Sequence, residues 1–168
     1  MVPALLLAAV LAAACGDDGA AGDDDGTALP ATGCGDERQE RVDPGSATHV
    51  LAGGAEPDSY ATDPPTSGPH VPGPLRSGVL DEPLTRPEQV GHLEAGGILV
   101  QHDGLTDAQV DELAGLAGEE VAVVPNPDLP APIVATAWLR TMRCSTPDLD
   151  ALDAFVVANV GRAPGSDG

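Results

Sequence analysis

A proline-rich stretch from Tyr60 to His70 constrains the conformation of this chain more than any other segment. It reads YATDPPTSGPH and contains Pro64, Pro65 and Pro69. Each proline fixes its own φ angle near about −65° and favours extended geometry in the residue before it. Gly68 can adopt backbone conformations closed to other residues, and the hydroxyls of Thr66 and Ser67 can satisfy turn amides. We therefore expect a rigid loop that projects His70 in a defined direction.

The N-terminal segment, Met1–Ala14, is almost wholly apolar. A run of this length is too short to span a bilayer and is typical of the apolar region of a secretory signal. It is followed by Cys15 and Gly-Asp-Asp, which resembles a bacterial lipoprotein cleavage site. We expect residues 1–14 to be a signal peptide and Cys15 to be lipidated, so that the exported protein is anchored to the outer face of the cell membrane. The alternatives are an ordinary signal peptide cut near Ala14 and an uncut anchor.

The charge of the chain excludes one class of partner. Its formal net charge is −20, from 27 acidic and 7 basic residues, and it contains no lysine. Nucleic-acid binding needs a basic surface that neutralises phosphates, so we expect no nucleic-acid partner. Docking on anionic lipid is disfavoured for the same reason, and attachment to the membrane would come from the lipid on Cys15. An acidic surface favours solubility and concentrates cations near the protein.

Two cysteines remain if Cys15 is lipidated. Cys34 and Cys144 lie at the start and near the end of the region that can fold. In an exported domain such a pair predicts a disulfide, which would stabilise the fold by about 4–5 kcal/mol in the chain-entropy model. Two buried thiols are the alternative. A zinc site on this pair is disfavoured because neither cysteine has a second one close by.

The pattern of the chain predicts one small compact α+β domain at residues 34–161. Residues 15–33 are rich in Gly, Ala and Asp without apolar periodicity, which predicts a disordered acidic tether, and residues 162–168 are expected to be a disordered tail. We expect a mostly antiparallel sheet with two helices. Thr106 with Gln109, and Thr146 with Pro147, mark the two helix starts. The expected strands are residues 48–51, 78–80, 98–102, 121–124 and 133–140.

Three motifs resemble the hallmarks of one family. Tyr60 to His70 fits the pattern Y-x-T-x-P-P-T-S-G-P-H, residues 90–96 resemble V-H-x-L-E-H-G, and Ala135–Trp138 with the downstream Cys144 resembles an A-x-A-W segment and its cysteine. These are hallmarks of the bacterial domain-of-unknown-function 3105 family. The resemblance covers about residues 34–161. It implies an exported or membrane-anchored protein whose biochemical role is not established.

The chain departs from the family pattern where a site would be expected. The pattern has histidines on both sides of Leu93-Glu94, and here those positions hold Gly91 and Ala95. A histidine occurs instead at His92. The strand that ends in tyrosine in the family ends here in His102. A site built on the family's histidines is therefore either degraded or rearranged in this chain.

One functional hypothesis is a metal site formed by His70, His92, Glu94 and His102. Neutral imidazole suits zinc and copper, and a carboxylate can complete a zinc site. No pair of these residues has a diagnostic spacing such as H-E-x-x-H, so the sequence assures no cofactor. The metal hypothesis is thus an alternative to a plainer one.

The main hypothesis is a non-catalytic binding or structural module at the cell surface. In it the proline loop is locked onto the sheet, Tyr60 and Trp138 pack beneath it, and His70 bonds to a carboxylate such as Glu94. A third hypothesis is a hydrolase with Ser67 or Thr66 as nucleophile, a histidine as base and Glu94 as its orienter. The loop lacks the strand-to-helix context of a nucleophile elbow, so we assign no catalytic residue. His49 has no motif around it and is expected on the surface.

Overall fold

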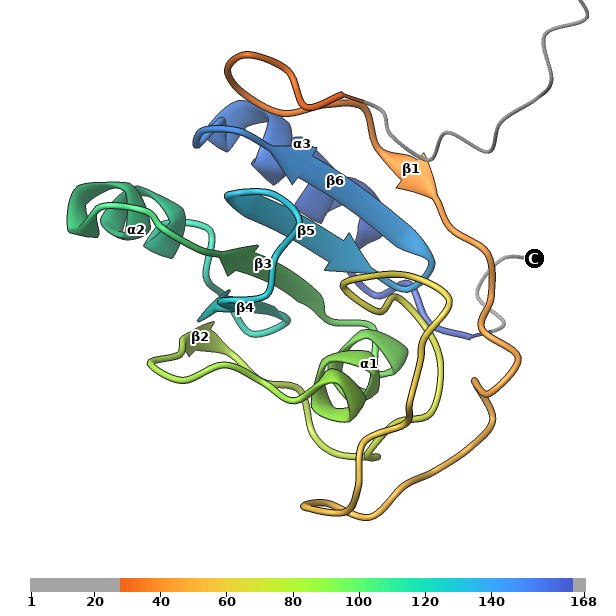
Figure 1. Ribbon diagram of the computed structural model, residues 1–168. Coiled ribbons are helices and arrows are strands. Elements are labelled where there is room, and N and C mark those ends of the chain that lie inside the picture. Colours follow the sequence, from red (N-terminus) through yellow and green to blue (C-terminus); the bar gives the residue numbers. More distant parts are fainter. Residues whose placement is uncertain (1–27, 165–168) are drawn as a thin grey trace, which may run out of the picture.

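The computed structural model describes residues 28–164, which form one α+β domain with a six-stranded mixed sheet and three helices (Figure 1). The predicted α+β class is confirmed. The predicted signal peptide at 1–14, the lipidation site Cys15 and the rest of the tether up to residue 27 lie outside the described residues, as do residues 165–168 of the tail. Within the described part of the chain, no helix is both long and apolar enough to cross a membrane.

The sheet has the strand order β1-β6-β5-β3-β4-β2. The pairs β1–β6, β6–β5 and β5–β3 are antiparallel, and β3–β4 and β4–β2 are parallel. The sheet is therefore antiparallel on one side of β3 and parallel on the other, where we expected a mostly antiparallel sheet. The strands are β1 (Arg38–Gln39), β2 (Gly78–Val79), β3 (Ile98–His102), β4 (Val121–Pro125), β5 (Ile133–Ala137) and β6 (Arg140–Cys144).

The parallel pair β3–β4 arises because a helix, α2 (Asp107–Ala114), connects the two strands. A parallel pair needs such a crossover, since a tight turn can join only antiparallel neighbours. The predicted start of this helix is confirmed: the hydroxyl of Thr106 accepts from the amide of Gln109 at 3.4 Å, and Oε1 of Gln109 accepts from the amide of Thr106 at 3.0 Å.

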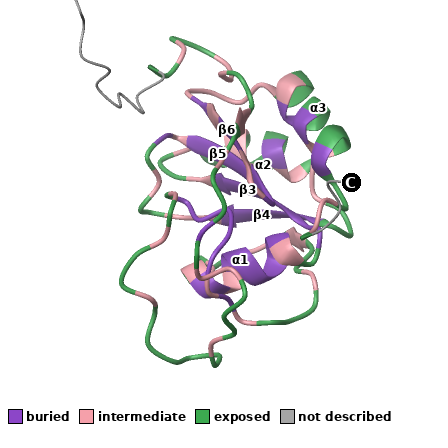
Figure 2. Cartoon of the chain, turned by 90° about the vertical axis from the view of Figure 1, so that its right-hand side faces the viewer, coloured by how far each residue is buried: buried purple, intermediate pink, exposed green. Residues whose placement is uncertain are grey.

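Helices cover both faces of the sheet (Figure 2). Helices α2 and α3 (Leu149–Asn159) lie on one face, where Leu113, Leu152 and Phe155 pack in the larger apolar cluster. Helix α1 (Arg86–Glu94) lies on the other face with a second cluster. Successive side chains of a strand point to opposite faces, so β3 contributes to both clusters. This is why its sequence reads as a continuous apolar run.

Helix α1 was not predicted. Its start has a capping box, in which Oε2 of Glu88 accepts from the amide and the hydroxyl of Thr85 at 3.0 and 2.8 Å, and Pro87 lies in its first turn. These start signals are visible in the sequence. The apolar stripe is not, because Gln89 and His92 are polar residues that this helix buries.

The segment predicted as one strand from Ile133 to Arg140 is two strands, β5 and β6, joined by a turn at Trp138-Leu139. Neither turn residue is a usual turn former, and Leu139 has a φ of 57°. The amide of Leu139 donates to the carbonyl of Thr66 at 3.3 Å, and its carbonyl accepts from the amide of Glu40 at 3.0 Å. Contacts distant in sequence therefore hold this turn, and local turn chemistry does not reveal it.

The disulfide between Cys34 and Cys144 is confirmed. It joins the segment before β1 to the last residue of β6, where the two cysteines also form an isolated antiparallel bridge. The domain's contacts begin one residue earlier than the expected end of the tether. The amide of Gly33 donates to the hydroxyl of Thr146 at 2.9 Å, and the carbonyl of Gly33 accepts from the amide of Ser145 at 2.9 Å.

Candidate metal centre

The proline loop packs against its own first residue. Gly68 has a φ of +133°, and a Cβ atom there would lie 2.6 Å from Cδ1 of Tyr60. The hydroxyl of Tyr60 donates to the carbonyl of Pro69 at 2.9 Å, and burial raises the pKa of Tyr60 to about 12. Tyr60 also packs against the apolar cluster that contains Trp138. Only glycine fits at position 68, and the loop is closed on the tyrosine ring.

Asp43 ties the proline loop to the chain that precedes it, and no motif in the sequence marks this residue. Its amide donates to Oγ of Ser67 at 2.8 Å, and its carboxylate accepts from the amide of Ala61 at 2.8 Å and from that of Gly45 at 2.7 Å. Thr66 is held in a similar way, since its amide donates to the hydroxyl of Thr62 at 3.0 Å. Ser67 and Thr66 are buried, so both hydroxyls of the hydrolase hypothesis lie away from any substrate.

His70 leaves the loop beside His49. The two residues form an isolated parallel bridge, in which the amide of His70 donates to the carbonyl of Thr48 at 3.0 Å and its carbonyl accepts from the amide of Val50 at 2.8 Å. The backbone therefore sets two histidines side by side, although 20 other residues separate them in the sequence. Their ring centroids are 4.9 Å apart in an edge-to-face arrangement.

The side chain of His70 is fully buried, and its two nitrogens have different surroundings. Nδ1 lies 3.0 Å from the carbonyl oxygen of Gly68. A carbonyl oxygen only accepts, so Nδ1 carries a proton and Nε2 of the neutral ring presents a lone pair. Nε2 lies 2.5 Å from Oε2 of Glu94, yet the direction of this contact is not that of a hydrogen bond, and Nε2 has no hydrogen-bond partner. Two electron-rich atoms this close need a proton or a metal cation between them.

Glu94 and His49 complete a cluster with His70. Glu94 is the last residue of α1, and its side chain is 31% exposed, whereas His49 is exposed to solvent. One ligand atom from each of the three residues lies within 4.8 Å of the others. Ligands of a tetrahedral zinc ion, each about 2.1 Å from the metal, lie about 3.4 Å apart. The contact between His70 and Glu94 must therefore open by about 1 Å around a metal, and the partly exposed carboxylate is free to move.

His92 does not join this cluster. Its Nδ1 accepts from the amide of Arg76 at 3.0 Å, and its Nε2 donates to the carbonyl of Ile98 at 3.0 Å. Burial lowers the pKa of His92 and keeps the ring neutral. A Cβ atom at Gly97 would lie 2.3 Å from Nε2, so the ring also fills the space beside that glycine. His92 connects α1 to β3, and both of its nitrogens are used in doing so.

His102 lies at the end of β3, opposite Pro125 and Ile133 in the neighbouring strands, and burial lowers its pKa. The structure thus brings together two of the four residues of the metal hypothesis, His70 and Glu94. It adds His49, which is exposed as expected. No local pattern in the sequence indicates a role for His49, because the bridge that sets it beside His70 is formed between segments far apart in the chain.

Position 91 shows how the site is arranged in this chain. A Cβ atom at Gly91 would lie 2.1 Å from the carbonyl oxygen of Val71, and the amide of Val71 donates to the carbonyl of Pro87 at 3.1 Å. A histidine at position 91 would therefore displace the segment that follows His70. Ala95 is exposed and follows Glu94 directly. The close approach of the loop to α1 depends on glycine at position 91.

Comparison with known proteins places these features in a family. The family model described as "Protein of unknown function (DUF3105)" matches residues 53–167, so it includes the proline loop and α1, whereas Cys34, Asp43 and His49 precede it. One of the subunits of the aspartyl/glutamyl-tRNA(Asn/Gln) amidotransferase of Bordetella petrii is 34% identical over 67 residues, which are 38% of this chain and 14% of that protein. No solved structure matches. Because the family model covers more than half of the chain, the protein belongs to the DUF3105 family of proteins of unknown function.

Proposed function

We propose that this protein is a non-catalytic binding module in which His49, His70 and Glu94 hold a divalent transition metal, zinc or copper. Two imidazoles and one carboxylate form a mixed nitrogen and oxygen donor set that suits both metals. Three protein ligands leave a coordination position open to water or to a ligand of the metal. The net charge of −20 raises the local concentration of cations around such a site.

The observation that carries the proposal is the surroundings of Nε2 of His70. This atom is buried, has no hydrogen-bond partner and faces a carboxylate oxygen at 2.5 Å. Since Nδ1 is committed to the carbonyl of Gly68, the lone pair of the neutral ring points at the place where a cation would neutralise the contact.

A purely structural contact is the second candidate. If His70 is protonated on both nitrogens, the same 2.5 Å approach is an ion pair that fastens the proline loop to α1. The two candidates differ in what they need from His49. An ion pair does not need this exposed ring, whereas a metal centre uses it as a ligand.

We propose further that the protein acts outside the cytoplasm, held at the membrane by lipid on Cys15. The apolar segment Met1–Ala14 and the small residues before Cys15 support this location. The disulfide between Cys34 and Cys144 supports it as well, because disulfides persist in oxidising compartments.

The test is calorimetric titration of the Cys15→Ser protein, which carries no lipid, with zinc and with copper salts. We expect one metal per chain with a dissociation constant below about 10 μM. His49→Ala should abolish binding without lowering the melting temperature, because its side chain is exposed. His102→Ala is the control and should bind like the parent protein. Absence of binding, or equal binding by His49→Ala, would leave the ion pair as the role of His70.

A further inference from the structure

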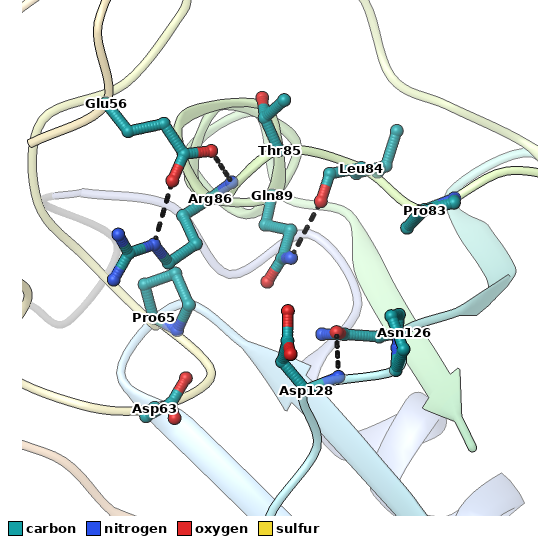
Figure 3. Close-up of a pocket in the computed structure, with 11 residues that line it drawn as sticks. Glu56, Asp63, Pro65, Pro83, Leu84, Thr85, Arg86, Gln89, Asn126 and Asp128 are labelled. Carbon is teal, nitrogen blue, oxygen red and sulfur yellow. Dashed lines mark hydrogen bonds and ion pairs between the residues drawn. The ribbon is translucent and has the colours of Figure 1, made fainter. Parts of the chain in front are cut away.

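A cavity of about 410 Å³ lies between the proline loop, the start of α1 and the loop that follows β4 (Figure 3). Small-molecule sites usually have volumes of about 300–1,000 Å³, with mostly apolar walls and a few polar groups that fix the ligand. Pro65, Pro83, Leu84 and Pro127 supply apolar wall here. None of the three proposed metal ligands lines this cavity, so it is separate from the metal centre.

Gln89 presents an unused acceptor to the cavity. The residue is only 3% exposed, and its Nε2 donates to the carbonyl of Leu84 at 3.0 Å. This bond fixes the orientation of the amide, since a flipped side chain would set Oε1 against a carbonyl oxygen. Oε1 then has no hydrogen-bond partner. Figure 3 shows it directed into the space between Pro65 and Asp128. A ligand group that donates a hydrogen bond would satisfy it.

The charges around the cavity select the sign of the ligand. Glu56, Asp63 and Asp128 line it together with one basic residue, Arg86, so acidic groups exceed basic ones by two. The charge of Arg86 is already balanced, because its Nε lies 3.0 Å from Oε2 of Glu56. The same carboxylate accepts from the backbone amide of Arg86 at 3.2 Å, and so occupies the place that an anion would take at the start of α1. An anionic ligand is therefore disfavoured, and a cation is favoured.

We propose that this cavity binds a small aliphatic primary amine, such as a short diamine, whose ammonium group donates to Oε1 of Gln89. The ammonium has three donors and no acceptor, which matches an unpaired acceptor beside carboxylates. Asp63 and Asp128 balance the positive charge at the mouth of the cavity. The methylene chain lies along the proline and leucine wall. The loop that ends at His70 thus also supplies one wall of an organic-cation site.

The experiment titrates the full-length Cys15→Ser protein with 1,4-diaminobutane and records the side-chain amide signal of Gln89 by NMR. We expect this signal to shift in a saturable way, while 1,4-butanediol, which has the same chain without charge, leaves it unchanged. Asp128→Asn should weaken the diamine about tenfold, the effect of one lost charge-assisted contact. Asp153→Asn, the same exchange at an exposed site on α3, should leave the affinity as it is.

Further variants separate this site from the metal centre and from packing effects. His49→Ala should bind the diamine like the parent protein, whether or not the parent binds metal. Gln89→Met should remove the response even where its melting temperature is unchanged. The proposal is overturned if Asp128→Asn and Asp153→Asn weaken the diamine equally, if butanediol binds as well as the diamine, or if calcium chloride alone shifts the Gln89 signal.

Discussion

Nε2 of His70 and Oε2 of Glu94 lie 2.5 Å apart, although one belongs to the proline loop and the other to the end of α1. The approach depends on Gly91, because α1 can lie against the carbonyl of Val71 only where no side chain intervenes. A single glycine thus sets how closely the loop approaches the helix that carries the carboxylate.

Gly91→Ala should separate the loop from α1. Its Cβ would lie 2.1 Å from the carbonyl oxygen of Val71, so the backbone must move. Overpacking of this kind costs about 1–3 kcal/mol, and the movement should also weaken metal binding at His70 and Glu94. Urea unfolding and calorimetry measure the two effects. Gly118→Ala is the control, since a Cβ there meets open space, and an equal loss in both variants would contradict the explanation.

Gly68→Ala should destabilise the proline loop itself. Its Cβ would lie 2.6 Å from the ring of Tyr60, and its φ of +133° is closed to alanine. We expect a loss of more than about 2 kcal/mol in the free energy of unfolding. Tyr60→Phe keeps the ring and removes only the hydrogen bond to Pro69, so it should lose about 1 kcal/mol. Equal stability of Gly68→Ala and the parent protein would show that the loop tolerates a different path.

Replacing Cys34 and Cys144 together with serine should lower the free energy of unfolding by about 2–5 kcal/mol. The disulfide closes a loop with a sequence separation of 110 residues. Chemical unfolding of the variant measures the loss. The parent protein under reducing conditions should unfold at the same urea concentration as the variant, and a parent protein indifferent to reductant would show that the bond does not stabilise the fold.

Stability should fall as the pH drops through about 6.5, partly because of His102. Burial lowers the pKa of this ring below its usual 6.5, and the nearby charge of Asp103 opposes that effect in part. The unfolded chain then binds more protons than the folded one, so this contribution is complete above the unfolded pKa and is lost as the pH falls. His102→Gln should show a shallower loss of stability between about pH 8 and 5. A slope equal to that of the parent protein would exclude His102 as a source.

The sequence predicted those features that depend on neighbouring residues. The start of α2 at Thr106 follows from a local capping pattern, and β3 follows from a short apolar run. The loop of Tyr60 to His70 was predicted to be rigid because its prolines restrict the backbone directly. The pairing of Cys34 with Cys144 could be predicted because few cysteines were available.

The features that were missed depend on contacts between distant segments. The turn at Trp138-Leu139 is held by the backbones of Thr66 and Glu40, and His49 reaches the site only through its bridge to His70. Helix α1 hides its period because it buries Gln89 and His92, each bonded to a backbone atom outside the helix. No pattern read along the chain contains this information.

The disulfide also decides where a mechanical load enters the domain. If the protein is held at Cys15, a pull from the N-terminal side reaches Cys34 and passes through the sulfur atoms to Cys144 in β6. Strand β1, which is two residues long and lies at the edge of the sheet, is thereby bypassed. The force is taken up by β6, which lies inside the sheet between β1 and β5. A protein fastened in this way can be tugged by its attachment without its edge strand being peeled from the sheet.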